Sequence, residues 1–108
     1  KKSDFLEGTY AVHGIEEVMQ PTDVVICVDP YPEEIAKFRE VLADGVGLNL
    51  VVVSTTDLGL PGIQLPSAGA FDGFVQLAAG WSLLVEVGLR LGVDLDHPVR
   101  ARKVGNAV

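Results

Sequence analysis

Two continuous apolar runs, separated by one amphipathic segment, constrain the fold of this chain more than any other feature. Residues 23–29 read Asp-Val-Val-Ile-Cys-Val-Asp, and residues 48–53 read Leu-Asn-Leu-Val-Val-Val. Such β-branched runs are typical of parallel strands that helices cover on both faces. Residues 31–45 predict a helix with Pro in its first turn, one apolar stripe, and an end at Asp44-Gly45. Strand, helix and strand together predict a parallel βαβ unit.

A long apolar segment follows a short third strand, which we expect at residues 63–65. It predicts a helix over residues 70–91, with Ser67 or Asp72 near its N-cap. Apolar residues nearly encircle this helix, which predicts burial against more than one neighbour, with Phe74 and Trp81 in the core. Because so small a domain can hardly supply those neighbours, we expect a partner chain or a missing half.

Composition narrows the function classes. The chain has 15 acidic and 8 basic residues, a net charge of −7, and no strong basic cluster, which argues against nucleic acid and anionic membrane as partners. Four polar residues interrupt the long helix and argue against a membrane span: Asp72, Gln76, Glu86 and Arg90. The single cysteine, Cys27, lies within the first strand and is expected in the core. No metal or cofactor motif is present, and a cytoplasmic location is expected.

Few residues offer chemistry. A lone histidine is usually structural, but His13 lies close in sequence to Glu7, Glu16 and Glu17, and a neutral imidazole there could move protons. Lys103 is either a solvated tail residue or a Schiff-base lysine whose pKa the neighbouring Arg100 and Arg102 could lower.

Two segments resemble one known family. Residues 7–17, Glu-Gly-Thr-Tyr-Ala-Val-His-Gly-Ile-Glu-Glu, precede the first strand and resemble the His-Gly-Pro segment of sugar isomerase (SIS) domains. Residues 91–104, Leu-Gly-Val-Asp-Leu-Asp-His-Pro-Val-Arg-Ala-Arg-Lys-Val, resemble the end of glucosamine-6-phosphate synthase and its SIS relatives. There a Gly-x-Asp-x-Asp-x-Pro turn follows a long apolar helix, and a lysine stands five residues after the proline. With the intervening βαβ unit, the resemblance covers essentially the whole chain.

The resemblance implies an α/β fold: a three-layer, SIS-like parallel sheet of flavodoxin or Rossmann type, with a long buried C-terminal helix and an irregular tail. It implies that His13 opens the sugar ring and moves protons, and that Lys103 forms a Schiff base with an open-chain ketose phosphate. The family's glutamate base lies upstream of the histidine, so Glu7 and Glu16 are only the nearest substitutes. No cofactor or metal is implied. Isomerase, aminotransferase and deglycase chemistry all stay open.

The chain departs from the family at three places. Ile15 stands where the family has proline, Gly105-Asn106 follow the lysine, and the Ser/Thr-rich phosphate loop is absent. We therefore expect residues 1–108 to be the later portion of an SIS domain that lacks its N-terminal part. A companion SIS domain and a homo-oligomer would complete a site for a sugar phosphate, and the isolated chain would be inactive. The alternative is a non-catalytic SIS domain that binds a sugar phosphate for regulation or serves structure alone.

Overall fold

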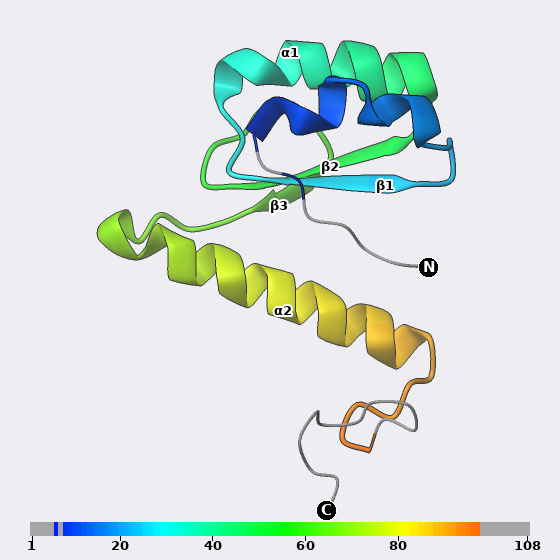
Figure 1. Ribbon diagram of the computed structural model, residues 1–108. Coiled ribbons are helices and arrows are strands. Elements are labelled where there is room, and N and C mark those ends of the chain that lie inside the picture. Colours follow the sequence, from blue (N-terminus) through cyan, green and yellow to red (C-terminus); the bar gives the residue numbers. More distant parts are fainter. Residues whose placement is uncertain (1–5, 7, 98–108) are drawn as a thin grey trace, which may run out of the picture. The chain divides into compact units, whose positions relative to one another are not determined.

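The computed structural model of the protein describes residue 6 and residues 8–97 (Figure 1). The chain divides into two compact units, Lys1–Gln76 and Leu77–Val108, and each is described by itself.

A parallel sheet forms the centre of the first unit. Its strands are β1 (Val24–Val28), β2 (Asn49–Ser54) and β3 (Gly62–Gln64), in the order β1-β2-β3. Both pairings are parallel, with Val24 opposite Asn49 and Val52 opposite Gly62. The predicted α/β class, the βαβ unit and the short third strand are confirmed, although the second and third strands are shifted by one residue.

The crossover between β1 and β2 is helical throughout but not uniform. A 3-10 turn, η3 (Pro32–Glu34), leads into α1 (Ile35–Phe38) and then into a wider π-helical segment, η4 (Arg39–Val46). The predicted end at Asp44-Gly45 is wrong, because the backbone N–H groups of Gly47 and Leu48 both donate to the Leu42 carbonyl, at 3.1 and 3.2 Å. Gly47, with φ of 81°, ends the helix in the left-handed conformation that glycine adopts without strain.

Two short helices precede the sheet where the sequence shows no periodicity. They are the 3-10 helices η1 (Gly8–Val12) and η2 (Ile15–Val18). Ala11 and Val12 of η1 are buried and belong to the core. One-turn helices are too short to give a periodic apolar pattern, so the sequence could not predict them.

One face of the sheet carries the core. The buried cluster comprises Ala11, Val12, Ile35, Phe38, Leu42, Leu48, Leu50 and Val52. In Figure 1 the N-terminal helices and the α1 crossover lie on the same side of β1 and β2. Val25 and Cys27 of β1 pack partly buried against this cluster, so Cys27 does serve packing as predicted.

The opposite face of β1 is open. Val24, Ile26 and Val28 remain 57%, 41% and 52% exposed, and Ile63 of β3 is 43% exposed. Within the described part of Lys1–Gln76, the predicted three layers are therefore seen only as a sheet and one helical layer. A strand that is apolar on both faces still has one of them uncovered.

The long helix forms close to where the sequence places it. A 3-10 turn, η5 (Gly69–Phe71), runs into α2 (Asp72–Arg90), and the Asp72 carboxylate accepts the Ala68 N–H as a local cap. Gly92, with φ of 68°, ends α2, and the N–H of Val93 donates to the Gly88 carbonyl at 3.0 Å. This is a Schellman ending, in which a left-handed glycine satisfies the last carbonyls.

The described chain does not bury this helix, and the cover expected from a partner chain or a missing half stays a prediction. No residue of α2 is buried, and Phe74 and Trp81, expected in the core, are 70% and 63% exposed. An apolar composition shows that a helix needs a covering surface, but it does not supply one. By length and composition alone, Gly69–Arg90 could cross a membrane, with a mean hydropathy of 1.2.

Candidate functional site

The turn between η1 and η2 presents His13. The side chain is exposed, and the His13 backbone N–H donates to the Tyr10 carbonyl at 3.3 Å. Gly14 follows with φ of 109°, and its N–H donates to Glu16 Oε2 at 2.6 Å. The structure thus places two of the predicted site residues, His13 and Glu16, in one turn.

The Glu16 carboxylate serves that turn rather than the imidazole. Its hydrogen bond goes to a backbone N–H, a pairing typical of carboxylates at the start of a helix. Among residue 6 and residues 8–97, the one contact within 4 Å between a basic nitrogen and a carboxylate oxygen joins His97 Nδ1 to Asp94 Oδ2 at 3.8 Å, so no carboxylate there pairs with His13. The other two predicted site residues, Glu7 and Lys103, lie outside the described residues.

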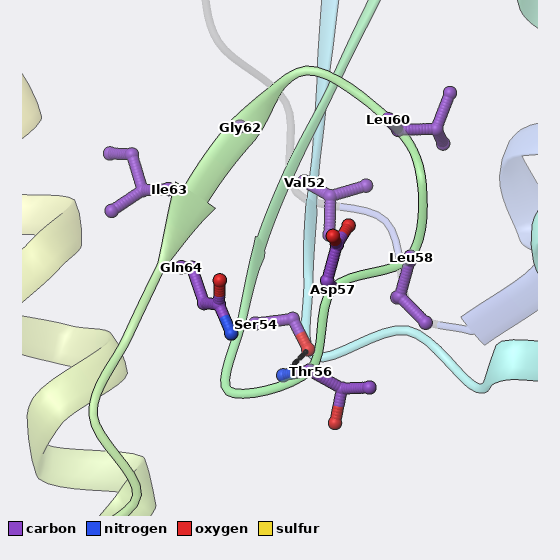
Figure 2. Close-up of a pocket in the computed structure, with 9 residues that line it drawn as sticks. All are labelled: Val52, Ser54, Thr56, Asp57, Leu58, Leu60, Gly62, Ile63 and Gln64. Atoms are coloured by element: carbon purple, nitrogen blue, oxygen red, sulfur yellow. Dashed lines mark hydrogen bonds between the residues drawn. The ribbon is translucent and has the colours of Figure 1, made fainter.

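A second group of polar residues gathers where β2 and β3 end. A shallow pocket of about 180 Å³ lies here, and Figure 2 shows its lining: Val52, Ser54, Thr56, Asp57, Leu58, Leu60, Gly62, Ile63 and Gln64. The carboxyl ends of parallel strands are the edge at which open α/β sheets usually bind ligands. Ser54 and Gln64 place one part of this pocket at that edge, and the pocket extends along β3 to Gly62 at its start.

Local hydrogen bonds hold the polar side of the pocket in place. Ser54 is only 3% exposed, and its Oγ accepts the Thr56 N–H at 3.1 Å (Figure 2). Asp57 Oδ1 accepts the Gly59 N–H at 2.9 Å. Such side-chain turns fix the loop without using regular secondary structure.

Two longer-range features fix the same loop. Arg39 of η4 donates from Nη2 to the Gly59 carbonyl at 2.9 Å, across 20 residues of sequence. At Gly62, a Cβ would meet the Val52 carbonyl oxygen at 1.8 Å, so only glycine lets β3 come this close to β2. The loop from β2 to β3 is therefore held in place at two points, by the Arg39 hydrogen bond at Gly59 and by the close packing of Gly62 against Val52.

The pocket has an acidic rather than a basic character. Asp57 is its one charged lining residue, and neither lysine nor arginine lines it. No group of three or more His, Cys, Asp or Glu residues within the described part of the chain is arranged to hold a metal ion. The arrangement offers hydroxyl, amide and carboxylate groups for hydrogen bonding.

This pocket was not predicted from the sequence, although the polar run Ser54-Thr55-Thr56-Asp57 directly follows the second apolar run. Its position after a parallel strand is the signal that could have identified it. The sequence could not predict that Gln64 lines the pocket, because its position there depends on the parallel pairing of β3 with β2.

The tail motif begins with a structured turn. Asp94 Oδ1 accepts the N–H groups of Asp96 and His97, at 3.1 and 2.9 Å. The first aspartate of the Gly-x-Asp-x-Asp-x-Pro pattern therefore shapes the turn that follows α2. The proline itself and the lysine beyond it lie outside the described residues.

Comparison with known proteins adds no relative: no family model, curated protein or solved structure matches the chain. The likeness to SIS domains therefore rests on the motif residues alone.

Proposed function

We propose that this chain is an SIS-type domain that takes part in phosphosugar processing, as an isomerase, aminotransferase or deglycase. One observation carries the proposal: an exposed His13 stands in a fixed glycine turn ahead of a parallel sheet. The likeness of the sequence motifs at both ends supports it. The same reading makes the chain a cytoplasmic domain that works with a companion SIS domain in a homo-oligomer.

In this proposal His13 moves protons and Lys103 forms the covalent link. The exposed imidazole can give a proton to the ring oxygen of a cyclic sugar and take one from the anomeric hydroxyl, which opens the ring. The Lys103 amine then adds to the ketose carbonyl, and loss of water leaves an imine. Glu16, already bound to the Gly14 N–H, supports the turn that carries His13.

The test is reductive trapping on Lys103. Borohydride and fructose 6-phosphate are added to the protein in its complete form, companion domain included, and the modified residue is located by mass spectrometry. We expect the sugar on Lys103, its loss in Lys103→Arg, and unchanged trapping in Lys37→Arg, a matched change at an exposed lysine of α1. Trapping that ignores Lys103 contradicts the proposal.

A non-catalytic sugar-phosphate sensor is the second candidate. The observation that favours it is that the Glu16 carboxylate accepts the Gly14 N–H and serves the turn, whereas aldose–ketose isomerisation needs a base beside the carbonyl carbon. The sensor predicts that fructose 6-phosphate binds without trapping and that His13→Gln weakens binding. If neither trapping nor binding occurs, only a structural role is left.

A further inference from the structure

The pocket at the ends of β2 and β3 uses none of the residues assigned to phosphosugar chemistry. From its lining we infer that it is a binding site for a neutral polyol, which it holds through adjacent hydroxyl groups. This inference is independent of the function proposed for His13 and Lys103.

The charge of the pocket selects against anions. Recognition of a phosphate needs cationic side chains or a nest of free N–H groups. Here the only charged lining residue is Asp57, and the loop N–H groups of Thr56 and Gly59 are taken by Ser54 and Asp57. The Ser/Thr-rich run is therefore not suited to a phosphate.

The hydrogen-bonding groups of the pocket suit hydroxyls. Asp57 Oδ1 accepts the Gly59 N–H, and no described residue donates to Oδ2. The Ser54 hydroxyl accepts the Thr56 N–H, and its own proton has no acceptor among the described residues. Gln64 lies across from them at the end of β3, and its amide offers both a donor and an acceptor (Figure 2). Hydroxyl groups, which both donate and accept, can satisfy all three.

The rest of the lining suits the carbon skeleton of such a ligand. Val52 and Leu58 contribute apolar surface beside the polar groups, and the Ile63 side chain points away from them (Figure 2). Binding sites for small molecules commonly combine an apolar wall with a few placed polar groups. A polyol presents C–H groups between its hydroxyls and matches this combination.

The loop is also ordered before any ligand binds. Its turns are closed by Ser54 and Asp57, and Arg39 holds the Gly59 carbonyl. Binding of a ligand therefore carries no free-energy cost for ordering the loop, which increases the affinity.

The experiment is a titration of the ¹⁵N-labelled protein with sorbitol, followed by amide NMR shifts. We expect saturable shifts centred on Thr56, Asp57 and Gln64. Asp57→Asn keeps an oxygen for the Gly59 N–H but removes the charge, and we expect it to weaken binding about fivefold, the difference between a charged and a neutral acceptor. Asp44→Asn, a matched change at an exposed site in η4, leaves the affinity unchanged.

A second ligand separates this inference from the proposed function. Sorbitol 6-phosphate should shift the same amides and bind no more tightly than sorbitol, because the pocket has no cation for the phosphate. Unsaturable shifts, shifts centred elsewhere, tighter binding of the phosphate, or an unaffected Asp57→Asn variant each overturn the inference. Trapping on Lys103 is measured separately, so either idea can fail alone.

Discussion

The helical layer over the sheet and the helix α2 are both built from apolar residues, but they differ in what those residues contact. Leu42 of η4 is fully buried and Val52 of β2 is 5% exposed, whereas Leu84 and Trp81 of α2 are 68% and 63% exposed. In the first region, strands and helix present complementary apolar faces within one short stretch of chain. The second region has its helix caps but none of its side chains is buried. Local sequence can therefore complete a helix without completing a core.

The largest expected effect comes from cutting the same side chain in the two regions. Leu42→Ala removes a fully buried side chain and should lower the free energy of unfolding by about 2–5 kcal/mol, because it loses burial and leaves a cavity. Leu84→Ala in α2 should change it by less than about 0.5 kcal/mol, as exposed sites usually do. Urea unfolding measures both, with the amide NMR signals of β2 reporting on Leu42→Ala and those of α2 on Leu84→Ala.

The comparison fails if Leu84→Ala lowers the free energy of unfolding as much as Leu42→Ala does. That result would mean that α2 is covered in solution, and the companion domain or second copy expected from the sequence would be the first cover to test.

The fold illustrates which parts of a structure local sequence determines. The β-branched run of β1 and the stripe with Ile35 and Phe38 identify a strand and a helix, because each pattern repeats at the period of its element. The wide turn at the Leu42 carbonyl and the burial of Val12 were not predictable, since both depend on contacts made after collapse. Whether the exposed face of β1 or the surface of α2 is covered depends on parts of the protein that lie further away still, so the local sequence does not determine it.

A smaller effect is expected from adding one methyl group to glycine in each region. Gly62→Ala places a Cβ against the Val52 carbonyl, which belongs to the backbone and cannot rotate away, and we expect a loss of about 1–3 kcal/mol. Gly80→Ala lies inside α2 with nothing within 4 Å of the new Cβ, and should stabilise the helix by about 0.5–1 kcal/mol.

Amide hydrogen exchange resolves the two glycine variants. Gly62→Ala should speed exchange in β3 and abolish sorbitol binding, while Gly80→Ala should slow exchange in α2 only. Equal protection of β3 in Gly62→Ala and in the unaltered protein would show that β3 can move away from β2 at no cost.

The candidate sites divide in the same way. His13 was predicted as a chemical residue from its neighbours in sequence, and its exposure agrees with access to a ligand. The pocket needed the pairing of β2 with β3, which brings Gln64 to the end of the sheet that carries Ser54. A local motif can be read from the chain, but a site assembled from two strands requires their register.

The smallest effect concerns Cys27, whose side chain lies partly buried against the core. Burial raises the pKa of its thiol above the usual 9.0, since the thiolate is poorly solvated there. Between the unfolded and the folded pKa, the folded state keeps a proton that the unfolded state has released. The contribution of the protonated Cys27 thiol to the stability of the folded state is therefore complete below about pH 9 and is lost as the pH rises through the folded pKa.

The variant Cys27→Val cannot titrate and keeps a side chain suited to a strand. The difference in the free energy of unfolding between wild type and variant, measured in urea from pH 7 to pH 10, therefore isolates the effect of the thiol. We expect the wild type to lose stability relative to Cys27→Val over the upper part of that range, and iodoacetamide to react slowly with the folded protein at pH 7.5. A constant difference, together with rapid alkylation, would show that β1 is open on both faces and that its helical cover is not maintained in solution.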